Sequence, residues 1–124
     1  MKGIRFLTEK EVIFINALVI KRYSQSEQVG VKDYNLLDSA LNRPKQSAFG
    51  GDAFPSFWSK AAALYASLCK NHAFHNANNR TGFAAMKQFL WVNGYMLKVS
   101  EEDAEEYTLV VVNRKPPINE IAAW

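Results

Sequence analysis

The residues best suited to chemistry lie in one short polar stretch, residues 71–82, which reads Asn-His-Ala-Phe-His-Asn-Ala-Asn-Asn-Arg-Thr-Gly. It holds both histidines of the protein, His72 and His75, together with four asparagines and Arg80. Histidine is the side chain whose ordinary pKa allows proton transfer near neutral pH. A guanidinium beside the free N–H groups at a helix start forms an anion site, most naturally for phosphate. The stretch therefore predicts a base facing a phosphate site, an arrangement suited to nucleotide-dependent group transfer.

Two helical segments must position this stretch. Residues 56–70 are rich in alanine, leucine and aromatic residues, and residues 81–92 repeat apolar residues at helical spacing. Either Asn78 or Asn79 lies where the second segment should start, and asparagine is among the best N-cap residues. We therefore predict a helix-loop-helix corner with Arg80 in the first turn of its second helix, and we expect that helix to be the central one.

Residues 72–81 resemble the signature of the Fic/Doc superfamily, and they are closer to its Doc (death-on-curing) toxin branch than to the Fic adenylyltransferases. Fic proteins usually show His-Pro-Phe-x-acid-Gly-Asn-Gly-Arg, and Doc-type sequences typically read His-x-Phe-x-Asp/Asn-Ala-Asn-Lys-Arg-Thr. This chain has Ala77 where the Fic pattern has its first glycine, and Asn79 where the Doc pattern has lysine. The resemblance extends upstream through residues 30–50 and downstream through residues 93–95, so it covers most of the chain.

This resemblance implies a single Fic/Doc domain over residues 1–124. The fold would be all-α, a Fic-like helical bundle with the motif loop between two central helices. The implied activity is that of the toxin of a toxin-antitoxin module, which transfers phosphate from ATP to the host elongation factor Tu with the help of Mg²⁺ and so arrests translation. The implied partner is a separate, Phd-like antitoxin whose disordered tail folds into a groove on this chain.

The resemblance also implies roles for individual residues. His72 would be the catalytic base, and Phe74 would anchor the loop in the core. Asn76 stands where many relatives carry an acid, so it would bind Mg²⁺ weakly through its amide oxygen. The residues expected to hold the phosphates are Asn78, Asn79, Arg80 and Lys70. His75 forms a His-x-x-His pair with His72, but no Cys, Asp or Glu lies in the loop to complete a zinc site, and we interpret it as a surface or structural residue.

Two alternatives remain open for the function. The first is the Fic reaction, adenylyl transfer (AMPylation) to a protein hydroxyl, although Ala77 and Asn79 are bulkier than the glycines of that motif and would crowd the phosphates. The second is a catalytically weakened toxin that acts mainly as an antitoxin-binding module. Absence of ATP or Mg²⁺ binding would favour the second alternative.

Composition limits the remaining possibilities. The chain has 124 residues, 48% of them hydrophobic, and a formal net charge of +3 without any block of like charges, so no direct nucleic-acid contact is expected. The single cysteine, Cys69, cannot form an internal disulfide and is predicted to be a buried structural thiol. The longest apolar run near the start, residues 12–20, is interrupted by Asn16 and is too short to span a membrane. A cytoplasmic location is expected.

The rest of the chain predicts further helices. A capping box at residues 8–11 opens a helix whose broad apolar face should be largely buried, and Asp33 should cap a second helix that ends before Pro44. Residues 46–55 should be irregular, and by resemblance they would form a flap beside the active site, with Phe49 and Phe54 as candidates for substrate contact. Residues 100–112 could form a helix or end in a strand, and a short helix should follow from residue 118.

Overall fold

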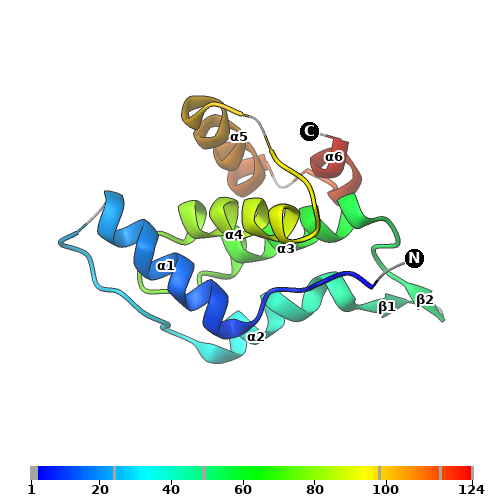
Figure 1. Cartoon of the computed structure of the whole chain (residues 1–124), viewed down its shortest axis with the longest axis horizontal. Coiled ribbons are helices and arrows are strands. Elements are labelled where there is room, and N and C mark those ends of the chain that lie inside the picture. The colour runs from blue at the N-terminus through cyan, green and yellow to red at the C-terminus, as the bar shows by residue number, and fades with distance from the viewer. Residues whose placement is uncertain (1–2, 24, 49, 98, 115, 124) are drawn as a thin grey trace.

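The structure is a computed structural model, and it describes residues 3–23, 25–48, 50–97, 99–114 and 116–123. Most of these residues are helical, which confirms the all-α prediction (Figure 1). The elements are α1 (Glu9–Tyr23), α2 (Tyr34–Asn42), the 3₁₀ helix η1 (Arg43–Lys45), β1 (Ser47–Ala48), β2 (Gly51–Asp52), α3 (Phe57–Asn71), α4 (Asn78–Val92), α5 (Glu101–Arg114) and α6 (Ile118–Ala123).

Short polar side chains begin several of these helices, as their sequences predict. Thr8 and Glu11 form the expected capping box before α1, because the Thr8 N–H donates to the Glu11 carboxylate and the Glu11 N–H donates to the Thr8 hydroxyl. The Asp33 carboxylate accepts from two N–H groups at the start of α2. Ser56 caps α3, and Ser100 accepts from the Asp103 N–H at the start of α5. Of the two possibilities for residues 100–112, the structure shows the helix, which continues to Arg114 without a strand at its end.

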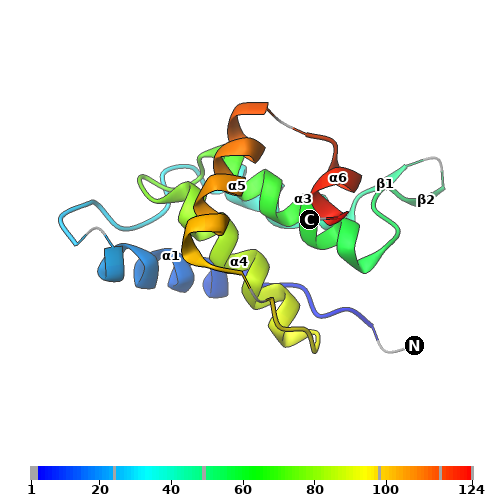
Figure 2. The same cartoon turned by 90° about the horizontal axis from the view of Figure 1, so that it is seen from above.

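The central helix is α3, not α4 as we expected from the sequence. All ten residues from Lys60 to Cys69 are buried, so α3 is covered on every side. Helices α2 and α5 lie on opposite sides of the layer formed by α3 and α4 (Figures 1 and 2). The first turns of α4 approach α3 very closely at Gly82. A Cβ atom added there would lie only 2.7 Å from the Cys69 Sγ.

The prediction that α1 is largely buried is wrong. Its buried residues are Val12, Asn16, Val19 and Ile20. Phe14 is 63% exposed and Leu18 is 49% exposed. An apolar stripe that surrounds most of a helix needs partners on several sides, and the described part of the chain covers only one side of α1.

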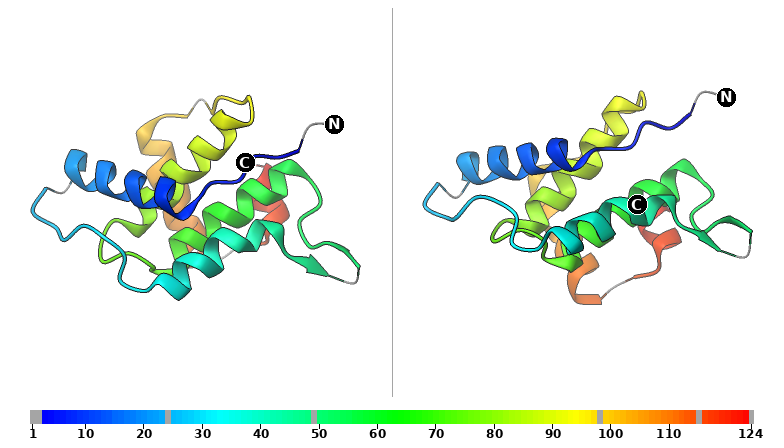
Figure 3. Two further views of the ribbon diagram at one scale, coloured as in Figure 1. Left: turned by 60° about the horizontal axis from the view of Figure 1, so that its bottom comes forward. Right: turned by 90° about the horizontal axis from the view of Figure 1, so that it is seen from below.

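Residues 46–55 contain a small β-hairpin, where we expected irregular structure. Strands β1 and β2 pair antiparallel, with Ser47 opposite Asp52 and Ala48 opposite Gly51. The hairpin precedes α3 and the motif loop follows it, so the 15-residue helix separates them by roughly 20 Å (Figures 1 and 3). The structure therefore contradicts the expectation of a flap beside the loop.

Of the two aromatic residues expected to contact substrate, the structure describes one. Phe54 is half-buried, and its ring lies 5.5 Å from the guanidinium carbon of Arg43. Phe49 lies outside the described residues.

The C-terminal helices complete the core. The hydroxyl groups of Tyr65 on α3 and Thr108 on α5 form a buried hydrogen bond, and Val111 and Ile121 add apolar contacts to the core. Among the described residues, no helix combines the length and hydrophobicity that a membrane span needs.

Candidate functional site

The motif loop, residues 72–77, joins α3 to α4, as predicted (Figure 1). Both of its ends have a left-handed backbone. His72 follows α3 with φ 53°, and Ala77 precedes α4 with φ 60°. Histidine adopts this conformation more readily than most residues, but alanine adopts it only at a cost. The sharp reversal between the two helices therefore depends on contacts that hold the loop in place.

Asn78 supplies one such contact, and the prediction that it or Asn79 caps α4 is wrong. The N-cap residue is Ala77, which makes no side-chain capping bond. The Asn78 side chain instead accepts from the Phe74 N–H at 3.0 Å and donates to the Phe74 carbonyl at 3.1 Å. This reciprocal pair ties the middle of the loop to the first residue of α4.

Phe74 lies in the core, as its expected anchoring role requires. Its side chain is 1% exposed, and its backbone forms a β-bridge with Val31. The neighbouring backbone groups also bind the segment before α2, because the His75 N–H donates to the Gly30 carbonyl at 3.1 Å. The loop is thus attached both to the core and to residues 30–33.

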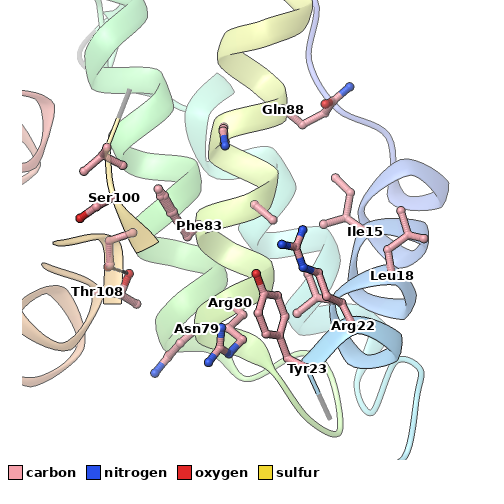
Figure 4. Close-up of a pocket in the computed structure, with 15 residues that line it drawn as sticks. Ile15, Leu18, Arg22, Tyr23, Asn79, Arg80, Phe83, Gln88, Ser100 and Thr108 are labelled. Atoms are coloured by element: carbon pink, nitrogen blue, oxygen red, sulfur yellow. Dashed lines mark hydrogen bonds between the residues drawn. The ribbon is translucent and has the colours of Figure 1, made fainter. Parts of the chain in front are cut away.

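Arg80 lies in the first turn of α4. The first hydrogen bond within this helix runs from the Thr81 N–H to the Ala77 carbonyl, so the N–H groups before Thr81 have no acceptor within the helix. The Arg80 guanidinium carbon lies 4.1 Å from the centre of the Tyr23 ring at the end of α1 (Figure 4). The first turn of α4 contains no acidic residue. A cation at the positive end of a helix dipole is unfavourable unless an anion is nearby, so this corner is suited to a phosphate.

Arg80 and Asn79 also line a groove of about 590 Å³ between α1, α4 and the start of α5 (Figure 4). Its walls include the apolar side chains of Leu18 and Phe83. Its cationic residues are Arg22, Arg80 and Lys87, and no carboxylate lines it among the side chains that the structure describes. The place of this groove and the residues Arg22 and Tyr23 were not predicted, although the basic last turn of α1 could have indicated them.

The other predicted site residues lie outside that groove. The side chains of His72 and His75 are exposed, and Lys70 is half-buried in the last turn of α3. The structure therefore places Asn79 and Arg80 together in the groove, while His72 and Lys70 lie at the end of α3 on the other side of the loop.

Asn76, the predicted Mg²⁺ contact, is half-buried in the loop. Its amide nitrogen donates to the Gln28 carbonyl at 3.1 Å. No group of three or more His, Cys, Asp or Glu residues that could hold a metal occurs in the described part of the chain. The Asn76 amide oxygen is a neutral ligand, so an ion held there would need most of its oxygen ligands from nucleotide phosphates and water.

Cys69 is the buried thiol that the sequence predicts. Burial raises its pKa to about 12, and its sulfur lies 3.8 Å from the Asn79 carbonyl oxygen. The thiol is therefore protonated at neutral pH and has a packing role below the first turn of α4.

Sequence comparisons agree with this arrangement. The Fic/DOC family profile matches residues 6–90, which include α1, the motif loop and most of α4. The chain is also 42% identical over 98 residues to a protein named Toxin Doc from Mycolicibacterium smegmatis, an alignment that covers 77% of this chain and 75% of that protein. No solved structure matches the chain significantly. The chain belongs to the Fic/DOC family.

Proposed function

We propose that this protein is the toxin of a toxin-antitoxin module and that it transfers a phosphate from ATP to elongation factor Tu. The observation that carries the proposal is the motif loop, which begins with an exposed histidine, His72, and is followed by a cationic helix start. Membership of the Fic/DOC family and the similarity to Toxin Doc support a transferase and a toxin. The identity of the phosphate donor, the identity of the target and the transfer of a phosphate instead of an adenylyl group are part of the proposal.

In the proposed reaction, His72 accepts the proton of the target hydroxyl while the hydroxyl oxygen forms a bond to the γ-phosphorus of ATP. The bond from that phosphorus to the ADP oxygen breaks, and ADP leaves. Arg80, Asn79 and the first-turn N–H groups of α4 hold the phosphates, with Asn78 fixing the loop and Lys70 adding charge. Asn76 and the phosphates would hold Mg²⁺, which would neutralise negative charge on the phosphates.

Intact-mass analysis of elongation factor Tu after incubation with the protein, ATP and Mg²⁺ tests this reaction. We expect a gain of one phosphate. The variant His72→Asn tolerates the left-handed backbone and should reduce the gain by at least about a hundredfold, because general-base catalysis contributes that much. His75→Asn is the matched control and should leave the rate unchanged. A gain of one adenylyl group would instead establish the Fic reaction, and no gain with folded protein would refute this donor and target.

We further propose that the groove receives an acidic, partly apolar segment of a separate antitoxin. Its cations Arg22, Arg80 and Lys87, the lack of carboxylates among its described lining residues and its apolar walls are complementary to such a segment. The groove shares Arg80 with the phosphate corner, so a bound carboxylate would compete for the cation that the phosphates need. Co-purification with the antitoxin, lost in Leu18→Asp, would support this partner. Binding that is unaffected by Leu18→Asp would place the antitoxin elsewhere.

A further inference from the structure

Asn16 is the one polar residue among the buried side chains that α1 contributes within the described part of the chain. It is 0% exposed and interrupts an apolar run. Burying an amide costs free energy unless both its donors and its acceptor find partners. Asn16 only partly meets this condition, because its Oδ1 is buried without a hydrogen-bond partner in the part of the chain that the structure describes. Packing alone would favour an apolar residue here.

The donors of Asn16 bind two parts of the site. Its Nδ2 donates to the Asn76 carbonyl in the motif loop at 3.0 Å and to the Thr81 hydroxyl in the first turns of α4 at 3.0 Å. Thr81 is itself fully buried, and its N–H forms the first intrahelical bond of α4, to the Ala77 carbonyl. One side chain of α1 therefore connects the loop to the start of the helix that carries Arg80.

We propose that Asn16 is a positioning residue for the transfer reaction. Its amide fixes the Asn76 carbonyl and the Thr81 hydroxyl relative to each other, and thereby sets where the loop presents the Asn76 side chain and the phosphate-binding turn. This role in catalysis rests on the proposed function, but the ordering of the loop does not depend on it.

Amide hydrogen exchange measured by NMR tests the ordering directly. In Asn16→Leu, which has a similar shape but no donors, the His75 and Thr81 N–H groups should exchange about tenfold faster, since two hydrogen bonds are lost. The Tyr95 N–H, which bonds the Leu90 carbonyl at the far end of α4, should keep its rate. Equal acceleration at Tyr95 would indicate general destabilisation and overturn the proposal, as would unchanged exchange in the loop.

A change at Thr81 keeps the test decisive if Asn16→Leu folds poorly. Thr81→Val removes only the hydroxyl and should reproduce part of the acceleration at Thr81. Combining it with Asn16→Leu should add little, because both changes remove the same bond. If the double variant accelerates exchange by the product of the two single accelerations, the link through Thr81 is overturned. Ser67→Ala is the matched control, since it removes another buried oxygen that has no hydrogen-bond partner among the described residues, but on α3 and outside the two segments that Asn16 joins, and it should change neither loop amide.

The same variants then distinguish positioning from a purely structural role. Asn16→Leu should lower the transfer rate about tenfold and raise the Mg²⁺ concentration needed for the half-maximal rate, whereas Ser67→Ala should change neither. An unaltered rate and Mg²⁺ dependence would overturn the catalytic part of the proposal. If the unmodified protein transfers no phosphate, the proposed function fails, and the exchange experiment still decides whether Asn16 orders the loop.

Discussion

The motif loop and the β-hairpin lie at opposite ends of α3, and the chain holds them in different ways (Figure 1). Amide side chains attach the loop to backbone groups, as in the bonds from Asn78 to Phe74 and from Asn16 to Asn76. The hairpin is attached to α3 by the Lys60 ammonium, which binds the Asp52 carboxylate and the Phe54 carbonyl. A planar amide fixes the direction of its partners, whereas an ammonium can donate in many directions. The bonds to the loop therefore fix its orientation, whereas the bonds to the hairpin attach it to α3 without fixing its orientation.

Backbone conformation shows the same contrast. The positive-φ residue of the hairpin is Gly50, with φ 82°, for which this conformation has no steric cost. The loop instead uses His72 and Ala77 at positive φ. Strained residues persist only where the surrounding contacts determine their conformation, and such positions cluster at functional sites. This difference supports the loop, and not the hairpin, as the site of chemistry.

The largest effect on stability should come from the glycine at the loop end of the α3–α4 contact. Gly82→Ala would place a methyl group 2.7 Å from the Cys69 Sγ and 3.2 Å from its backbone nitrogen. We expect a loss of about 3 kcal/mol of unfolding free energy, because the helices must move apart. Urea denaturation measures this loss. Gly51→Ala in the hairpin is the control, since a Cβ there has no atom within 4 Å, and an equal loss in both variants would contradict the contrast.

The next effect concerns ATP affinity. Arg80→Gln should weaken ATP binding about thirtyfold, or roughly 2 kcal/mol, because a charge-assisted bond to phosphate is lost. Arg22→Gln is the control, since Arg22 also lines the groove and lies 5.2 Å from the Tyr23 ring, but on α1. Calorimetry should show little change for Arg22→Gln. Equal weakening in both variants would place the nucleotide along the whole groove instead of at the start of α4.

Asn78→Ala should destabilise the protein by about 1.5 kcal/mol, since the buried Phe74 N–H and carbonyl both lose a partner. Thermal unfolding measures the change. Asn42→Ala is the matched control near the hairpin, because its side chain also makes two bonds, to the Asp38 carbonyl and carboxylate, but at an exposed position. Its cost should stay below about 0.5 kcal/mol, and a larger cost would show that both ends are held equally firmly.

Much of the fold could be predicted because its signals are local. The capping residues Thr8, Asp33, Ser56 and Ser100 depend on residues within one helical turn. The position of the loop followed from the same signals. The burial of Cys69 also followed from its place on an apolar helix.

Some errors come from the local backbone geometry, and others come from contacts between distant segments. Asn78 could serve equally well as a cap or as a tie to Phe74, and only the left-handed Ala77 decides between these roles. The exposure of Phe14 and the burial of α3 depend on which faces the other helices cover. Asn16 was visible as a polar break in an apolar run, but its partners are 60 and 65 residues away in sequence, so its role could not be predicted.

A smaller change tests the strain in the loop. Ala77→Gly should stabilise the protein by about 0.5–1 kcal/mol, because glycine adopts φ 60° without the steric cost of a Cβ. Thermal unfolding measures the gain. The variant also restores the glycine of the Fic pattern, so its transfer products should be compared with those of the unmodified protein. Lower stability would show that the alanine methyl group makes a packing contact worth more than the strain.

The smallest effect is expected at the hairpin. Lys60→Met removes a buried ammonium, but its partner Asp52 has a side chain that is 59% exposed, so no unpaired buried charge remains. Solvent screening makes such a pair weak, and the methionine stem keeps the apolar contacts, so stability should change by less than about 1 kcal/mol. The hairpin should still loosen, and the Ala53 N–H, which bonds the Gln46 carbonyl, should exchange faster. ATP binding and transfer should be unchanged. A loss of transfer without a loss of stability would show that the hairpin reaches the substrate despite its distance from the loop, and would overturn the assignment of chemistry to one end of α3.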